Sequence, residues 1–194
     1  TLVSQAPLAF NASLGSAANS HTSYMKNKND VSHQCAGENS LETRIDKAGF
    51  EPGMSSGSYV SVSENIGGCF NSNGSFSVAS YMLAAFAIDW GIPSHEHRDA
   101  MMNTNYSEVG ISIMQTSKSI GPYIVTCDFG ASEYGVRTDG AYLLGVVYGD
   151  ENEDCFYDVG EGVSNASILI ERIDDGIVDS ITISSWKSGG YPIF

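Results

Sequence analysis

Apolar and polar positions follow a helical period in the first part of the chain. Small and apolar side chains recur every three to four residues over 7–27, which predicts an amphipathic helix there. A second helix is predicted over 78–90, where Ser77 is a suitable N-cap, and its apolar residues run almost all round, so we expect it to be buried. A short helix should follow over 94–102. The segment 29–68 has little periodicity and is expected to be loop with short elements.

The pattern changes to strands after residue 108. Segments 109–114 and 123–129 alternate in polarity or are rich in β-branched residues, which predicts two strands joined by a turn. After a break at 137–140, the strand-like segments are 141–148, 166–170 and 178–183. We therefore expect an α+β chain of two domains, a mixed domain over 1–137 and a small all-β domain over 138–194.

Composition is typical of an acidic, exported globular protein. Hydrophobic residues make up 42% of the 194 positions, which is enough for a packed core. Nine basic residues against 23 acidic ones give a net charge of −14, which disfavours binding to nucleic acid and to anionic membranes. No apolar run reaches the roughly 18 residues of a membrane span. The cysteines form no CxxC pair, which disfavours a zinc ribbon and favours two disulfides in an extracellular compartment.

A series of short motifs in the first domain occurs in a characteristic order. The motifs are Ala17–His21 with Met25, Ser32-His33, Arg44 with Ala48-Gly49-Phe50, Ser63-Glu64-Asn65-Ile66, Trp90, His97-Arg98, Asn105–Ile111 and Cys127–Gly130. In this order they resemble the bacterial secreted branch of the CAP superfamily (cysteine-rich secretory proteins, antigen 5, pathogenesis-related 1). The resemblance implies secretion and an α/β/α sandwich with an antiparallel central sheet. Family members begin with an earlier helix, so we expect this chain to be a fragment or to have that face covered by a partner.

The resemblance also implies a cavity lined by two histidines and one or two acidic residues. The matching positions are His33, Glu64 and His97, and Glu96 is the nearest candidate for the second acidic residue. Two imidazoles facing a carboxylate suit a structural hydrogen-bond network, a divalent metal site such as Zn²⁺, or acid–base catalysis, and the sequence leaves these three open. His21 is expected to be packed rather than to bind a ligand.

The same placement implies a disulfide pairing. Because the cavity would bring its first histidine and its glutamate together, Cys35 and Cys69 should lie close to each other. Cys127, on the last strand of the first domain, would then pair with Cys155 in the second domain. This is one of three possible pairings of four cysteines.

An acidic loop in the second domain has the ligand spacing of an EF-hand-like calcium loop. The predicted ligands, at loop positions 1, 3, 5, 7, 9 and 12, are Asp150, Asn152, Asp154, the Phe156 carbonyl, Asp158 and Glu161. Cys155 stands where such loops normally have glycine, and a disulfide would hold that turn. The flanking segments are strands, and they resemble the calcium-bearing B-type repeats of bacterial surface adhesins. We therefore expect a small sandwich-like β module that binds Ca²⁺.

Three functions from different classes fit these observations. The sequence favours a secreted, calcium-binding, non-enzymatic module whose partner is a small apolar ligand, a peptide or a neighbouring protein subunit, with Zn²⁺ as a possible cofactor of the cavity. The first alternative is a subunit of an extracellular polymer or surface layer that a neighbouring chain completes. The second is a hydrolase or protease, which is disfavoured because no G-x-S-x-G or other nucleophile motif is present.

Overall fold

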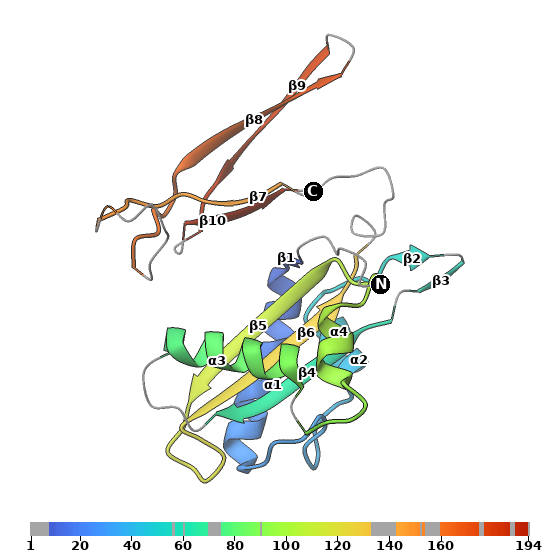
Figure 1. Ribbon diagram of the computed structural model, residues 1–194. Helices are drawn as coiled ribbons and strands as arrows, with labels where there is room; N and C mark the ends of the chain where they lie inside the picture. The colour runs from blue at the N-terminus through green and yellow to red at the C-terminus, as the bar shows by residue number, and fades with distance from the viewer. Residues whose placement is uncertain are drawn as a thin grey trace. The chain divides into compact units, whose positions relative to one another are not determined.

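The computed structural model divides into two compact units, Thr1–Gly140 and Ala141–Phe194. The residues that it describes are 8–55, 57–59, 61–69, 75–89, 91–132, 143–151, 153, 160–174, 177–186 and 189–193. The domain boundary expected at 137/138 lies outside these residues. We call the two parts unit 1 and unit 2, and Figure 1 shows both.

Unit 1 is built on a four-stranded sheet. The strands, in spatial order, are β1 (Ala9–Phe10), β5 (Glu108–Gln115), β6 (Tyr123–Gly130) and β4 (Ser63–Cys69). β5, β6 and β4 are antiparallel, whereas the two residues of β1 pair in parallel with β5. A separate hairpin consists of β2 (Met54–Ser55) and β3 (Ser58–Tyr59). Among the described residues, β4 is an edge strand of this sheet. A ligand bound by its side chains would therefore lie at the edge of the sheet.

Helices cover both faces of this sheet (Figure 1). On one face lie α1 (Ala12–Lys28) and α2 (Leu41–Lys47), and on the other lie α3 (Ser75–Ile88) and α4 (Glu96–Met101). The three layers agree with the expected α/β/α arrangement. β4 is a departure, because its segment was expected to be mainly loop.

The alternation of side chains along β6 builds one core on each face. Towards α1, Ile124 packs with Met25, and Thr126 accepts a 2.8 Å hydrogen bond from Thr22. Towards α3 and α4, the clustered side chains are Met82, Phe86, Ala100, Tyr123, Val125, Cys127 and Phe129. All eight residues of β6 are buried, so this strand is the centre of unit 1.

The start of α1 is set by Asn11. Its side-chain Oδ1 accepts hydrogen bonds from the backbone N–H groups of Ser13 and Leu14, at 2.9 and 3.1 Å. Its Nδ2 donates to the buried Glu108 carboxylate at 2.8 Å, which ties the helix to β5. The helix therefore begins later than the sequence pattern over 7–27 predicted.

The prediction of a fully buried helix over 78–90 was wrong. Met82 and Phe86 face the sheet and are each 5% exposed, but Tyr81, Leu83 and Ile88 are more than half exposed. The reason is that α3 is an outer layer, so only one of its faces meets the sheet. No helix among the described residues is long and apolar enough to cross a membrane.

The described residues of unit 2 form two antiparallel pairs of strands. β7 (Leu143–Val146) pairs with β10 (Gly190–Ile193), and β8 (Ser167–Asp174) pairs with β9 (Ile177–Ser184). Buried Ser185 follows β9, and its hydroxyl donates to the Val163 carbonyl at 2.6 Å. A sandwich of these strands remains a prediction.

The expected disulfides are not formed. Cys35 and Cys127 are both buried free thiols, which contradicts the pairings Cys35–Cys69 and Cys127–Cys155. Cys35 packs with Met25 and Ile124 on the α1 face. Cys127 faces the α3 core, and Cys155 lies outside the described residues.

Candidate functional site

The predicted cavity residues lie in two clusters that attach to consecutive residues of β4. His33 contacts Glu64 through Nδ1 and Oε1, which are 2.9 Å apart. Asn65, the next residue, donates from Nδ2 to the backbone carbonyl of His97 at 2.9 Å. Because successive residues of a strand point to opposite faces, the two histidines reach the same edge of the sheet from its two sides.

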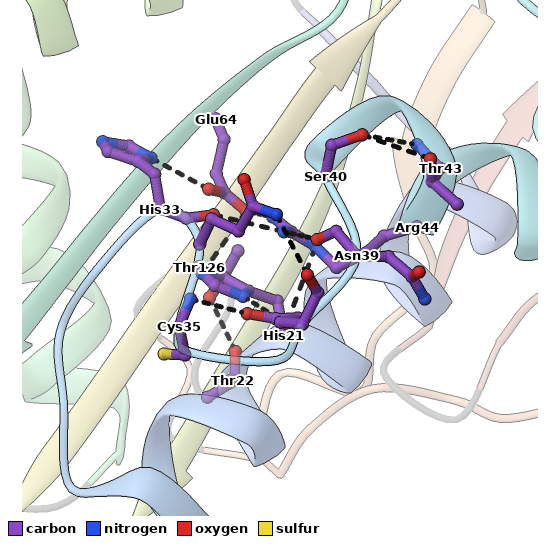
Figure 2. A network of polar contacts seen from close by, with 12 residues as sticks. His21, Thr22, His33, Cys35, Asn39, Ser40, Thr43, Arg44, Glu64 and Thr126 are labelled. Atoms are coloured by element: carbon purple, nitrogen blue, oxygen red, sulfur yellow. Dashed lines mark hydrogen bonds and ion pairs between the residues drawn. The ribbon is translucent and has the colours of Figure 1, made fainter.

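Glu64 is the centre of the first cluster, which Figure 2 shows. Its Oε2 lies 2.5 Å from a guanidinium nitrogen of Arg44 and 3.6 Å from Nε2 of His21. Nδ1 of His21 in turn lies 2.8 Å from Oε1 of Glu38. His21 and the Glu64 side chain are buried, whereas the side chain of His33 is 62% exposed. Glu64 thus joins a buried charge network to a histidine in contact with solvent.

Arg44 holds the loop that carries His33. Besides its ion pair with Glu64, it donates to the backbone carbonyls of His33 and Asn39, at 3.1 and 3.0 Å. Arg44 comes from α2, which Ser40 caps by accepting a hydrogen bond from the Thr43 backbone N–H (Figure 2). The cluster therefore depends on the short helix as much as on the strand.

Two carboxyl groups on the α1 face have opposite pKa shifts. Burial alone would raise the pKa of Glu64, but the hydrogen bond from His33 and the charges of His21 and Arg44 hold it below its usual range. Asp128, directly opposite Glu64 in the strand pairing, is buried, and neither of its carboxyl oxygens accepts a hydrogen bond from the described residues. Burial, together with the negative charge of Glu64, raises the pKa of Asp128 to about 8. Asp128 is therefore largely protonated at neutral pH.

Asp89 and His97 form the second cluster. Nδ1 of His97 lies 2.7 Å from Oδ1 of Asp89, and the Arg98 backbone N–H donates to the other carboxylate oxygen at 3.0 Å. The His97 ring stacks on Phe86 with 5.0 Å between centroids. Burial alone would raise the pKa of Asp89, but the hydrogen bonds from Arg98 and His97 lower it. Asp89 is thus a carboxylate at neutral pH and accepts the proton of Nδ1.

The segment between α3 and α4 holds this pair with strained backbone. Asp89 and His95 have φ of 54° and 53°, and Gly91 has φ of 82°. Left-handed conformations at non-glycine residues cost about 1–3 kcal/mol each and concentrate at functional sites. The strain places the end of α3 against the first turn of α4.

Asp89, rather than Glu96, is the acidic residue beside His97. Glu96 is exposed in the first turn of α4. Asp89 occupies the end of the preceding helix, directly before Trp90. The sequence signal was its place beside the tryptophan, but the sequence analysis sought a glutamate near the end of the tryptophan-containing helix and took Glu96 as the nearest candidate.

Both histidines present the same chemistry. An ionised carboxylate only accepts hydrogen bonds, so Nδ1 of His33 donates to Glu64 and Nδ1 of His97 donates to Asp89. In the neutral form of each ring, this arrangement leaves Nε2 with a free lone pair. A carboxylate that orients a histidine in this way is the usual outer partner of a metal-binding imidazole.

Among the described residues at this edge of the sheet, these two nitrogens are the candidate ligands of a metal ion. Among the residues that the structure describes, no group of three or more His, Cys, Asp or Glu side chains is placed to hold a metal ion. A bound ion would therefore complete its coordination with water or with a ligand.

The ends of the predicted calcium loop lie close together in unit 2. An isolated bridge joins Tyr148 to Gly162, and the Glu161 carbonyl accepts from the Gly149 backbone N–H at 2.9 Å. The Glu161 carboxylate accepts from the Glu151 backbone N–H at 3.1 Å. The first and last predicted ligands, Asp150 and Glu161, thus begin and end a closed loop. The other four predicted ligands, Asn152, Asp154, Phe156 and Asp158, lie outside the described residues.

Comparison with known protein families identifies the family to which unit 1 is related. Residues 3–129 match the CAP family, described as the cysteine-rich secretory protein family. The chain belongs to the CAP family. This CAP chain also resembles a solved extracellular protein containing an SCP domain from Bacillus anthracis, with 19% identity and a TM-score of 0.48 over 65% of this chain and 34% of that one.

A second solved relative of this CAP chain is an outer surface protein from Borrelia burgdorferi. The identity is 16% and the TM-score 0.47, over 66% of this chain and 80% of that one. The chain spans about a third of the length of the Bacillus protein. No curated protein matches the sequence.

Proposed function

We propose that this CAP protein is an extracellular, non-enzymatic binding module that holds a divalent metal ion such as Zn²⁺ between Nε2 of His33 and Nε2 of His97. The observation that carries the proposal is the matched pair of histidine–carboxylate contacts, at 2.9 Å for His33 and 2.7 Å for His97. Glu64 and Asp89 are then not ligands but fix the orientation of the two rings.

The attachment of both histidine segments to neighbouring residues of β4 supports this arrangement. Glu64 holds the ring of His33, and Asn65 holds the backbone at His97. An ion at this edge would keep open coordination positions, as zinc sites with few protein ligands do. These positions suit the partner classes expected from the sequence, a small ligand, a peptide or a side chain of a neighbouring subunit.

Zinc titration of the purified chain tests the proposal. His33→Ala and His97→Ala should each weaken zinc binding by at least tenfold, because each removes one of two protein ligands. Glu64→Gln and Asp89→Asn should weaken it by about 10–100-fold, the usual effect of losing an outer partner. His95→Asn is the matched control, since asparagine tolerates the left-handed backbone at that position. Wild-type affinity in both alanine variants would overturn the proposal.

In unit 2, we further propose that the loop from Asp150 to Glu161 binds one Ca²⁺. The backbone pairing between the two ends of the loop supports this, because it brings the first and last acidic residues of the loop close together. The clustered carboxylates would repel one another without an ion, so calcium binding should stabilise unit 2. EGTA should lower the melting temperature of the wild type and leave that of Glu161→Gln unchanged. A wild-type midpoint that EGTA does not move would contradict calcium binding.

A further inference from the structure

The outer edge of β5 is a row of backbone groups that no strand of the described residues pairs with. β5 pairs with β6 along its whole length, but on its other side β1 covers only the first two residues. The Val109 carbonyl points outward, because it accepts a hydrogen bond from the Asn11 backbone N–H. Hydrogen-bonding direction alternates along a strand, so the N–H and C=O groups of Ile111, Ile113 and Gln115 point outward too. An open edge of this kind is a template for another strand.

This edge lacks the features that keep other edge strands unpaired. Natural sheets protect their edges with lysine, proline or a bulge. No charged residue and no proline stands between Glu108 and Lys118. The eight residues of β5 also pair with β6 in one continuous register, without a bulge. The edge of β5 is therefore open to pairing rather than protected from it.

Apolar side chains accompany the free backbone groups. Ile111 lies opposite Cys127 and shares its face of the sheet, which carries α3 and α4. It is 47% exposed, since α3 packs mainly on β4 and β6. Ile113, on the same face, is only partly buried against that core. A strand added beside β5 would place its own side chains next to these isoleucines and remove apolar surface from water.

We propose that the partner at this edge is the β5 strand of a second copy of the chain, paired antiparallel about a two-fold axis at Ile113. In this register Ile113 lies opposite Ile113 of the second copy, and Ile111 lies opposite Gln115 of the second copy. Each of these residues exchanges its outward N–H and C=O with the other strand. The pairing sets no charge against a like charge, because the paired segment carries none.

Other occupants fit this edge less well. A continuation of β1 toward the N-terminus would run beside the residues before Glu108, because β1 is parallel to β5, and would not reach Ile111. A charged peptide would find no opposite charge on the segment from Val109 to Ser117. A two-fold pair of β5 strands, by contrast, is complementary to itself. It also closes, since each copy contributes its one free β5 edge and none is left for a third chain.

The dimer would carry two binding sites at opposite ends of one sheet. Its strands would follow the order β4-β6-β5-β5-β6-β4, so the two β4 strands would lie about 24 Å apart at the usual strand spacing. Two sites held in this way engage two points on one surface, which raises apparent affinity without any new contact. The pairing itself depends neither on the metal site proposed at the histidines nor on the calcium loop.

Sedimentation velocity of the full chain tests the proposal. The wild type should dimerise as its concentration rises over about 1 to 200 μM, the range of weak interfaces. Ile111→Lys should raise the dissociation constant at least tenfold, because a lysine on an edge strand resists an added strand. The fold should survive, since this side chain is half exposed in the single chain. Leu169→Lys is the matched control: Leu169 is 62% exposed on β8, and its replacement should leave the dissociation constant unchanged.

Hydrogen exchange of the wild type gives a measurement that needs no variant. In the dimer the amides of Ile111, Ile113 and Gln115 bond to the second copy, so dilution below the dissociation constant should make them exchange at least tenfold faster. The amides of Ser112 and Met114 bond to β6 and should stay protected at both concentrations.

Three outcomes would overturn the proposal. The first is a wild type that stays monomeric over the whole concentration range, as expected if an unrelated peptide occupies the edge. The second is a dimer that Leu169→Lys abolishes and Ile111→Lys leaves intact, because it would form through unit 2. The third is a dimer in which the three outward amides of β5 exchange as fast as in the monomer.

Discussion

Oδ1 of Asp89 lies 2.7 Å from Nδ1 of His97, and this contact joins the end of α3 to the first turn of α4. Asp89 is buried and has a left-handed backbone, so the surrounding structure holds it in a conformation that it would not adopt by itself. The His97 ring is fixed on its other side by Phe86. The position of His97 therefore depends on a residue that has no role in any motif we recognised.

Replacing Asp89 by asparagine should change the acid stability of the chain. The lowered pKa of Asp89 means that its contribution to stability is present above its unfolded pKa of about 4 and is lost as pH falls through its folded pKa. Urea unfolding at pH 2 to 7 should therefore show a smaller loss in acid for Asp89→Asn than for the wild type. Parallel pH profiles would contradict this assignment.

Removing Arg44 should destabilise unit 1 strongly. Arg44→Met leaves Glu64 and Glu38 buried without their cation and removes the donors to two loop carbonyls. Breaking a buried ion pair in this way costs about 3–5 kcal/mol. Lys47→Met is the matched control, because Lys47 is exposed on the same helix and its loss should change the free energy of unfolding by no more than about 0.5 kcal/mol. Equal effects of the two variants in urea unfolding would refute the prediction.

A methyl group at Gly110 should separate α1 from the sheet. The added Cβ would overlap backbone atoms of Leu14 and Gly15, which cannot move without shifting the helix. Overpacking of this kind costs about 1–3 kcal/mol and more where backbone must move. Gly149→Ala serves as the control, since a Cβ there meets nothing within 4 Å. We expect thermal unfolding of unit 1 at a clearly lower temperature in the first variant alone.

Two cysteines should be unreactive in the native chain. Burial raises the pKa of both thiols, that of Cys127 to about 12, so neither supplies a thiolate at neutral pH. Alkylation without reductant should modify Cys35 and Cys127 in denaturant but not in the folded chain, as read by peptide mass. Peptides linked by a disulfide between Cys35 and Cys69 would show instead that the pairing expected from the sequence is formed.

Elements with a strong local pattern were predictable, and those set by tertiary contacts were not. The strands β5 and β6 were found from their alternation and β-branched residues, and α1 from its period. β4 was missed because Gly67 and Gly68 weaken its strand pattern. The structure explains the second glycine, since a Cβ at Gly68 would lie 2.7 Å from the backbone carbonyl oxygen of Ile120. Such a requirement depends on a residue that is distant in sequence, so the local sequence pattern gives no sign of it.

The candidate site was predictable in part. The family motifs pointed to His33, Glu64 and His97, and the contact between His33 and Glu64 was expected for a hydrogen-bonded network. The roles of Asp89 and Asp128 could not be read from the sequence, because each depends on which charges the fold brings next to it. Asp128 stood in a matching motif, but only its lack of a cation partner distinguishes it from an ordinary strand residue.

The alternation of side chains along β4 affects how accurately this strand pairs with β6 during folding. Glu64 points to the cation of Arg44, and Asn65 points to the carbonyl of His97. If the strand paired with β6 one residue out of step, every side chain would change face, and depending on the direction of the slip either Glu64 would meet the His97 carbonyl oxygen or Asn65 would meet the Arg44 guanidinium. The first misplacement sets two hydrogen-bond acceptors against each other, and the second leaves Arg44 without its counter-charge. Glu64 and Asn65 therefore also favour the correct register of β4. Substituting either residue should yield some chains with β4 out of register, in addition to weakening the contacts of the site.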